Sequence, residues 1–224
     1  MARNGGLPRW VEVPVAALGL VLVLPVLLIA AAAIKVTSKG PVLFKQRRVG
    51  LGGKHFTLLK LRTMRPNADG LRVTIRGDSR VTTVGRWLRH FKLDEVPELW
   101  NVVRGDMSFV GPRPEVPEYV NEENELWRLV LRVRPGITDP VTLRLRNEEA
   151  LLAAAGDDPD RFYRETLQPF KLVGYASYLK HQNWQTDLGV IWATLKVVLA
   201  PGSVRALSAS EMLECVYRWK TRPR

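Results

Sequence analysis

The sequence is poor in the residues and motifs that mark several large protein classes. It contains one cysteine, Cys215, which excludes an internal disulfide and fits a reducing compartment. Its three histidines are dispersed, and we find no zinc-finger spacing, internal repeat or low-complexity segment. No phosphate-binding loop of the type GxxxxGK followed by Ser or Thr is present, which argues against a nucleoside-triphosphate hydrolase.

Acidic residues are scarce relative to basic ones. Lys and Arg total 34 against 22 Asp and Glu, which gives a formal net charge of +12. Such an excess favours polyanionic partners, namely nucleic acid, an anionic membrane surface or phosphorylated substrates. With 224 residues, 46% of them hydrophobic, the chain is long and apolar enough to form a folded core.

Charge is absent from residues 13–34, VPVAALGLVLVLPVLLIAAAAI. A helix over this segment, at ~1.5 Å per residue, would be long enough to cross a hydrocarbon core of ~30 Å. Three arrangements compete: a cleaved signal peptide, a spanning helix, and a re-entrant hairpin that enters and leaves one leaflet. The strongly basic sequence that follows argues against the signal peptide. Pro25, near the middle, and positive charge at both ends suit the hairpin, but the residues alone leave it level with the spanning helix.

The rest of the chain predicts short elements. Residues 42–46 and 55–61 predict two strands joined by a turn that contains Gly50–Gly53. Residues 109–117 contain three prolines and are expected to be extended. Helices are expected near the end of 79–91 and over 98–104, 118–133, 148–155, 159–172 and 183–199.

Two segments near the C-terminus are amphipathic. The helix expected over 183–199 has an apolar face that predicts packing in the core, with a membrane interface as the alternative. That face comprises Trp184, Leu188, Ile191, Trp192, Leu195, Val198 and Leu199. The basic tail, residues 205–224, predicts a helix that lies on a surface.

Residues 92–101, KLDEVPELWN, place Asp94 and Glu95 side by side in basic surroundings. Pro97 suits the first position of a helix, so the two acids would lie just before a helix N-terminus. Capping of that helix is the simplest explanation. The neighbouring cations allow two more: a salt-bridge network, or a phosphate clamp whose carboxylates supply a nucleophile and a divalent-metal ligand. These cations are Lys60, Arg62, Arg89, Lys92, Arg104 and Arg113.

Four segments resemble the monotopic phosphoglycosyl transferases, the bacterial sugar transferase family: SKGPVLFKQRRVG, FTLLKLRTM, GRWLRHFKLDEVPELWNVVRGDMSFVGPRPE and RPGITDP. The resemblance extends from about residue 9 to residue 199. It implies transfer of a phosphosugar from a nucleotide diphosphate sugar, expected to be a UDP-sugar, to polyprenyl phosphate with release of UMP. It also implies that Asp94 is the nucleophile of a covalent aspartyl intermediate, that Glu95 is its partner, and that both hold Mg2+.

The resemblance implies further binding residues. Basic residues would hold phosphates, prolines would shape the nucleotide pocket, and one acid has a less defined role. These residues are Lys60, Arg62, Arg89, Arg113 and Arg146, then Pro112 and Pro114, then Asp187. Three positions depart from the family pattern: Leu24 replaces a serine before Pro25, Glu12 replaces an aspartate, and Asp139 replaces a glycine. Asp tolerates a left-handed backbone, so the turn at Asp139 is expected to survive.

The implied fold is predominantly α with short β segments. Residues 1–36 would form a re-entrant membrane helix broken at Pro25, residues 37–204 a catalytic domain with interfacial amphipathic helices, and residues 205–224 a basic tail. The expected location is the cytoplasmic face of the bacterial inner membrane, in contact with anionic lipids. The expected pathway is glycoconjugate assembly, such as capsule, O-antigen, exopolysaccharide or glycoprotein synthesis.

The alternative is a membrane-tethered basic protein that binds anionic lipid or nucleic acid without catalysis. We find no nucleic-acid-binding motif, so nucleic acid is not expected as a partner. The chain resembles the minimal form of the family, which favours an N-acetylated UDP-sugar. The sequence does not identify the sugar or the oligomeric state, and a homo-oligomer is compatible with it.

Overall fold

The computed structural model describes residues 5–65, 74–156, 158–200, 205–208, 210–212 and 214. Over these residues the chain is mostly helical with two pairs of short strands, which confirms the predominantly α part of the predicted fold class and its short β segments. Most of the tail predicted as a surface helix, residues 205–224, lies outside the described residues. The elements are α1 (Arg9–Thr37), β1 (Leu43–Val49), β2 (His55–Leu61), α2 (Thr83–His90), α3 (Glu98–Arg104), β3 (Ser108–Val110), α4 (Glu125–Val130), β4 (Gly136–Thr138), α5 (Pro140–Arg144), α6 (Glu148–Ala153), α7 (Pro159–Phe162), α8 (Gln168–His181) and α9 (Trp184–Leu199).

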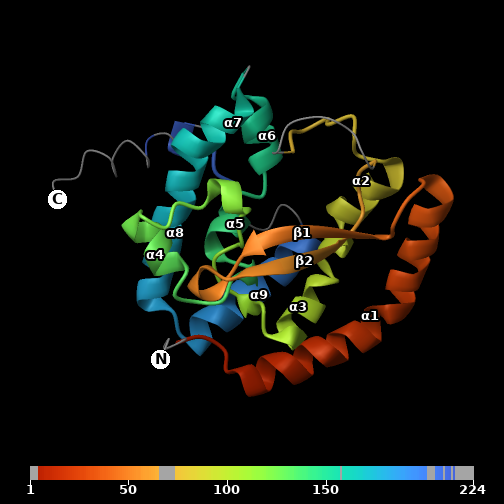
Figure 1. Ribbon diagram of the computed structural model, residues 1–224, viewed down its shortest axis with the longest axis horizontal. Helices are drawn as coiled ribbons and strands as arrows, with labels where there is room; N and C mark the ends of the chain where they lie inside the picture. The colour runs from red at the N-terminus through yellow and green to blue at the C-terminus, as the bar shows by residue number, and fades with distance from the viewer. Residues whose placement is uncertain are drawn as a thin grey trace.

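Helix α1 is long, apolar and bent. Among the described residues it is the one helix long and apolar enough to cross a membrane. It follows one edge of the molecule and then turns along the next, on the outer side of α3 and α2 (Figure 1). An interior proline removes a backbone hydrogen bond and bends a helix, and Pro25 lies inside α1. The predicted break at Pro25 is therefore a bend within a continuous helix.

The first part of α1 is held by buried polar contacts. The Arg9 guanidinium donates to the carbonyls of Val102 (2.5 Å) and Met107 (3.0 Å), at the C-terminal end of α3. Glu12, which is 2% exposed, accepts from Arg9 and from the backbone N–H of Phe109 at 2.9 Å. The glutamate that departs from the family pattern thus ties α1 to β3.

The last part of α1 contacts the same globular domain. Ala30 and Ile34 are buried against Leu61 of β2 and Leu88 of α2. Both ends of the apolar helix are therefore packed on one body of protein, a feature that bears on its position in a membrane.

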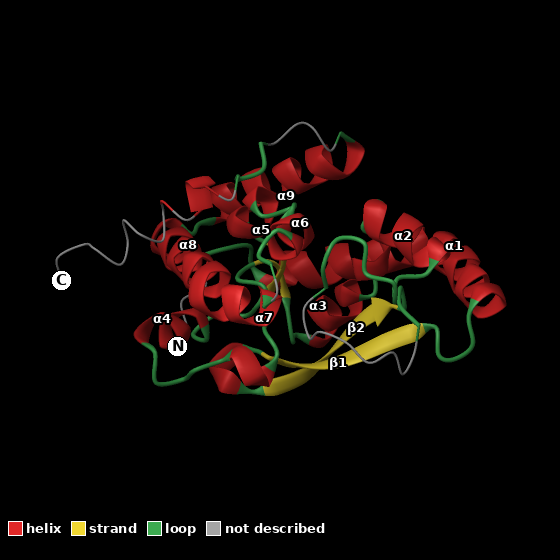
Figure 2. Ribbon diagram, turned by 90° about the horizontal axis from the view of Figure 1, so that it is seen from above, coloured by secondary structure: helices red, strands yellow, loops and turns green. Residues whose placement is uncertain are grey.

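The predicted glycine-turn hairpin is confirmed. β1 and β2 pair antiparallel from Leu43 opposite Leu61 to Val49 opposite His55. Gly52 and Gly53 have φ angles of 66° and 75°, which glycine adopts without strain. Seen from above, the hairpin lies on one face of the molecule and α9 on the opposite face, with α3 between them (Figure 2).

A short parallel pair, β3 and β4, fixes the proline-rich segment. A Cβ added to Gly136 would lie 2.1 Å from the backbone nitrogen of Gly111, so both positions require glycine. Beyond β4, Asp139 has an extended backbone (φ −159°) rather than the expected left-handed one. Its buried carboxylate caps α5 by accepting from the N–H groups of Val141 and Thr142, both at 2.7 Å.

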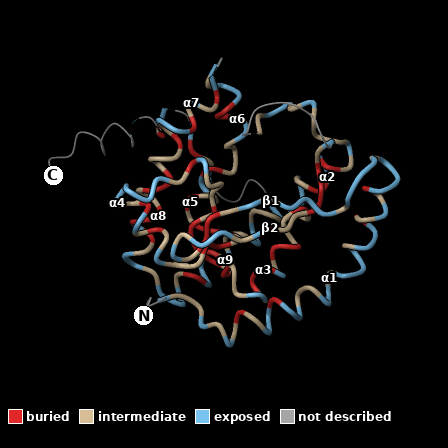
Figure 3. The backbone as a smooth tube through the Cα atoms, in the orientation of Figure 1, coloured by how far each residue is buried: buried red, intermediate tan, exposed pale blue. Residues whose placement is uncertain are grey.

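Most of the predicted helices are present. The helix predicted over 118–133 is shorter, from Glu125 to Val130, because Asn124 caps its start. The main core lies between α4, α5, α6 and α8, and includes Trp127, Leu145, Leu152 and Leu172. Few residues of α1 are buried by comparison (Figure 3).

The prediction that the apolar face of α9 packs in the core is wrong for most of that face. Trp184, Trp192 and Leu199 are 54%, 61% and 84% exposed. Ile191 does pack against the buried cluster that contains Val190, and the residues that α9 buries are Asp187 and Val190. An apolar stripe shows that a helix has an apolar neighbour, but not whether that neighbour is protein or lipid.

Candidate active site

Asp94 and Glu95 lie in a 3-10 turn, Leu93–Glu95, between α2 and α3. Lys92 enters this turn with a left-handed backbone (φ 56°), a conformation that is unusual for a residue other than glycine. Pro97 is the residue directly before α3, and the two acids precede it as expected. The turn places Asp94 inside the protein, where it is 7% exposed.

Glu95 is the carboxylate that two cations bind. Its Oε1 accepts from Lys60 Nζ at 3.1 Å and from an Arg113 NH2 group at 2.5 Å. Burial alone would raise the pKa of Glu95, but the charges of Arg113 and Lys60 outweigh burial and hold this pKa well below its usual range. Glu95 therefore keeps its charge and fixes the positions of both cations.

Asp94 has a different environment. Its Oδ1 atom is buried and has no hydrogen-bond partner in the described part of the chain. Burial raises the pKa of the Asp94 carboxyl, and the charge of Glu95 adds to the rise. Three cations are close enough to oppose it, namely Lys60, Lys92 and Arg89. A desolvated carboxylate with an uncommitted oxygen suits a nucleophile better than the doubly bound Glu95 does.

Glu98 is a member of this cluster that the sequence reasoning missed. It is 1% exposed on the first turn of α3, and its Oε1 lies 3.2 Å from Lys60 Nζ. Burial raises its pKa, while the charge of Lys60 opposes the rise. The signal was present, because Glu98 follows Asp94 and Glu95 by four and three residues, the spacing that puts side chains on one helical face.

The proline-rich segment positions Arg113. The Pro112 carbonyl accepts from the N–H of Gly136 at 3.0 Å, and the Pro114 carbonyl accepts from Arg48 at 2.9 Å. Arg113, held between them, donates to Glu95 and to the carbonyl of Ile137. The two prolines expected to shape a nucleotide pocket thus fix an arginine of the cluster.

Arg89 approaches the carboxylates from α2. Its Nε donates to Thr63 Oγ1 at 3.0 Å, and one NH group lies 2.7 Å from Glu149 Oε1 of α6. Arg146 is half-buried in the segment between α5 and α6.

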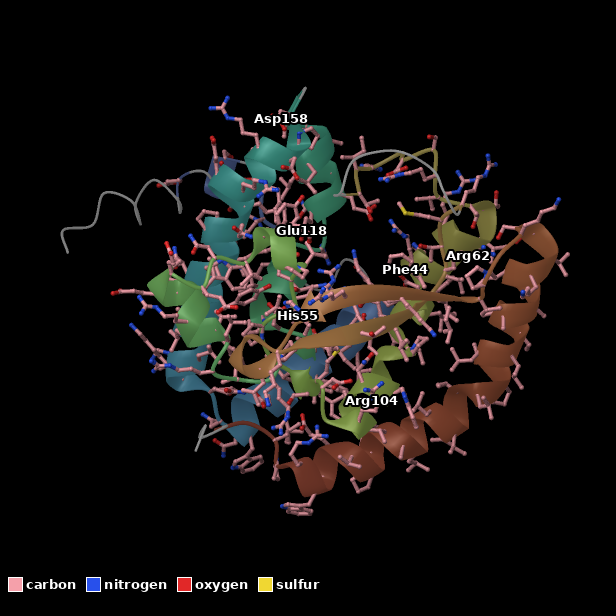
Figure 4. The ribbon with its side chains drawn as sticks, viewed as in Figure 1. Phe44, His55, Arg62, Arg104, Glu118 and Asp158 are labelled. Atoms are coloured by element: carbon pink, nitrogen blue, oxygen red, sulfur yellow. The ribbon has the colours of Figure 1, made fainter. Side chains whose placement is uncertain are left out.

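Arg62 and Asp187 serve other parts of the structure. The buried Arg62 guanidinium donates to the carbonyls of Ser38 and Lys39 at the end of α1. Arg62 is labelled in Figure 4. The buried Asp187 carboxylate accepts from the Tyr178 hydroxyl and, at 3.0 Å, from the N–H of Leu7. Arg62 thus anchors the end of α1 and Asp187 the segment before it, and the hydrogen bonds described for these two side chains do not involve Asp94 or Glu95. Arg104 pairs with Asp106 at the far end of α3 (Figure 4).

The carboxylates fit Mg2+ by their donor chemistry. Mg2+ prefers oxygen ligands and usually takes one or two carboxylates together with substrate phosphates. The uncommitted oxygen of Asp94 and the adjacent carboxylate of Glu95 supply such donors. Within the described ranges no group of three or more acid, histidine or cysteine side chains could hold an ion, so phosphate or water would have to complete the coordination.

An open groove of about 580 Å3 lies elsewhere, between the hairpin turn and α4. It is lined by Leu51, Gly52, Gly53, Glu122, Arg128, Leu131 and Arg132. None of the clustered acids lines it, so it is not the place where Asp94 would meet a substrate.

The sequence is similar to those of several known proteins. The chain is 48% identical over 141 residues to a UDP-glucose:undecaprenyl-phosphate glucose-1-phosphate transferase of Caulobacter vibrioides, which covers 61% of this chain and 53% of the relative. It is 40% identical over 135 residues to a UDP-N-acetylgalactosamine-undecaprenyl-phosphate N-acetylgalactosaminephosphotransferase of Aeromonas hydrophila, 58% of this chain and 32% of the relative. The exopolysaccharide production protein ExoY of Sinorhizobium fredii is 35% identical over 157 residues, 62% of this chain and 70% of the relative.

This chain thus spans about half of the Caulobacter protein and a third of the Aeromonas protein. The family described as bacterial sugar transferase matches residues 4–201, which includes α1 and every residue of the carboxylate cluster. The chain therefore belongs to the bacterial sugar transferase family.

Proposed function

We propose that this protein transfers a sugar 1-phosphate from a UDP-sugar to undecaprenyl phosphate and releases UMP. The observation that carries the proposal is the buried Asp94 carboxylate, whose Oδ1 is uncommitted and which feels the charges of Lys60, Lys92 and Arg89. Arg113 is bound to the adjacent Glu95. Family membership and the activities for which the Caulobacter and Aeromonas relatives are named agree with it.

In the first step an Asp94 oxygen attacks the phosphorus that carries the sugar. The bond from that phosphorus to the bridging oxygen breaks, and UMP leaves with the electron pair. An ionised aspartate needs no base for this attack, but the repulsion between two anions has to be masked. Lys60 and Arg113 are positioned for this task, because Glu95 holds both cations and each has N–H donors beyond the one that it gives to Glu95.

In the second step a phosphate oxygen of the polyprenyl carrier attacks the same phosphorus. The phosphorus–aspartate bond breaks, Asp94 regains its electron pair, and the lipid-linked diphosphate sugar forms. Mg2+, when held by Asp94 and Glu95, would supply charge neutralisation for the diphosphate. Glu98 forms an ion pair with Lys60 and keeps it in position in both steps.

We also propose that α1 is re-entrant and that the site faces the cytoplasm. A straight helix of 29 residues would measure about 43 Å and place its ends on opposite sides of a bilayer. Here both ends pack on the same domain, through Arg9 and Glu12 at one end and Ile34 at the other. The exposed tryptophans of α9 suit a place in the headgroup region.

The donor sugar is proposed only as a class. Two of the relatives named above are transferases of glucose 1-phosphate and of N-acetylgalactosamine phosphate, so UDP-hexoses with and without an N-acetyl group are candidates. A panel of UDP-sugars, tested with purified protein and undecaprenyl phosphate, would identify it.

The test of the proposed function is the Asp94→Asn variant. Asparagine keeps the shape of the side chain and is a far poorer nucleophile, so UMP release should fall at least about 1,000-fold, as expected for loss of a covalent nucleophile. In the wild type, peptide mass spectrometry after brief exposure to the UDP-sugar should show a sugar phosphate on the Asp94 peptide. Undiminished turnover by the variant would refute the nucleophile assignment.

A further inference from the structure

Arg89 has an anionic partner within the protein. One of its NH groups lies 2.7 Å from Glu149 Oε1, while its Nε donates to Thr63. Arg89 and Glu149 are 60 residues apart in the sequence and lie on α2 and α6. An arginine expected to bind phosphate is therefore bound to a carboxylate.

Glu149 lies close to the cations that surround Asp94. Burial raises the pKa of the Glu149 carboxyl, and the charges of Arg89 and Lys92 oppose that rise. The same two cations oppose the raised pKa of Asp94. The cations thus stand within electrostatic reach of both carboxylates, and a phosphate that approaches Asp94 beside Arg89 meets the negative charge of Glu149.

The Glu149 side chain is free to leave without disturbing α6. It is 51% exposed, and an ion pair at such a position contributes little to stability. The start of α6 is held by other contacts: the Glu149 carbonyl accepts from the N–H of Arg76 at 2.9 Å, and Glu148 pairs with the buried Lys171 at 2.8 Å. Rotation of one side chain would release Arg89.

We propose that Glu149 is an internal substitute for the substrate phosphate. It occupies Arg89 in the ligand-free protein, is displaced when a nucleotide-linked diphosphate binds, and thereby lowers the affinity of the site for that ligand. The role rests on the proposed function, and it makes Glu149 a determinant of affinity that does not take part in the bond-breaking steps.

The experiment is a binding titration of UDP and UMP against the purified full chain in detergent with MgCl2. In Glu149→Gln the competing charge is gone, and UDP should bind about five-fold more tightly, the change expected from loss of an exposed ion pair. Glu165→Gln is the matched control, because Glu165 forms a similarly exposed pair with Arg161 at 3.1 Å away from the cluster. The affinity of the Glu165→Gln variant for UDP should equal that of the wild type.

A double variant tests the mechanism. In an Arg89→Met background, Glu149→Gln should change UDP affinity less than two-fold, because the arginine for which the two anions compete is absent. Equal or weaker binding by Glu149→Gln, or an undiminished gain in the Arg89→Met background, would overturn the inference and leave the proposed function intact. Failure of the wild type to bind UDP, UMP or any UDP-sugar would instead contradict the proposed function and the inference with it.

Discussion

The carboxylates of Asp94 and Glu95 are adjacent in the chain but differ in what surrounds them. Glu95 accepts from Lys60 and Arg113, and its pKa lies well below the usual value. Asp94 keeps one buried oxygen without a partner, and burial raises its pKa. The ionised form of Glu95 is thus favoured by folding, whereas the ionised form of Asp94 is disfavoured.

This difference predicts stability effects of opposite sign. At pH 7 Asp94→Asn should raise the unfolding free energy by roughly 1 kcal/mol, because it removes a buried charge with an unsatisfied oxygen. Glu95→Gln should lower it by about 3 kcal/mol, because Lys60 and Arg113 lose their anionic partner. Thermal unfolding in detergent from pH 8 down to about pH 3, below the ordinary glutamate range, measures both.

The pH dependence supplies the control. A raised pKa gives stability that is present at low pH and lost as the pH rises through it, so the gain from Asp94→Asn should shrink on acidification. A lowered pKa gives stability that is present above the ordinary glutamate range and lost as the pH falls, so the deficit of Glu95→Gln should shrink too. A destabilised Asp94→Asn at pH 7 would show that the Asp94 charge is well compensated.

The sequence predicted the centre of the site but not its full membership. Asp94, Glu95, Lys60 and Arg113 converge as the resemblance implied. Glu98 was missed because an acid on a helix is commonly exposed, and its burial depends on contact with β2. No local pattern shows which arginine of a basic chain points at phosphate and which at a helix end.

Secondary structure was predictable where the signal is local. Glycine at positive φ ends α3 at Gly105 and closes the hairpin, and both were expected. Most of the apolar face of α9 was wrongly assigned to the core, because hydrophobic periodicity shows which face of a helix is apolar but not what covers it. The proline at position 25 predicted a disturbance in α1 but not its form.

The end of α1 yields a prediction for Arg62. Its guanidinium donates to the carbonyl and hydroxyl of Ser38, both at 2.9 Å, and to the carbonyl of Lys39. Arg62→Ala should therefore lower the unfolding free energy by about 2–4 kcal/mol, since several buried acceptors lose a charged donor. KM for the UDP-sugar should stay within two-fold of the wild type, because Arg62 contacts no residue of the carboxylate cluster.

Arg86→Ala is the matched control for Arg62→Ala. Arg86 is an exposed arginine of α2 whose side chain donates only a long bond, 3.3 Å, to Thr83 among the contacts described. Its loss should change stability by less than about 0.5 kcal/mol. A large rise in KM for Arg62→Ala, with normal stability, would restore Arg62 as a phosphate ligand.

In the described part of the chain, the large exposed apolar side chains lie mostly on α1, and the others lie in or next to β1, α2, α3 and α9. Residues of α1 such as Leu22, Ile29 and Val36 are 69%, 71% and 86% exposed, far more than a soluble protein tolerates over such a length. Lipid is the medium that removes this surface from water. A helix that lies in lipid and has both ends packed on one domain must enter and leave the membrane on the same side.

The re-entrant arrangement predicts that positions 2 and 39 lie on the same side of the membrane. In a Cys215→Ser background, single cysteines at these positions should react with an impermeant maleimide only after the inner membrane is opened.

Pro25→Ala restores a backbone donor in α1 and favours a straight helix that spans the membrane. A spanning helix would, however, lose the hydrogen bond from the N–H of Phe109 to Glu12 and the bonds from Arg9 to the end of α3. We therefore expect Pro25→Ala to expose position 2 in only a fraction of molecules, and Pro25→Ala with Arg9→Ala and Glu12→Leu to expose it in most. Labelling of position 2 from outside in the otherwise wild-type chain would show that α1 spans the bilayer and that its packing against α3 is lost in the membrane.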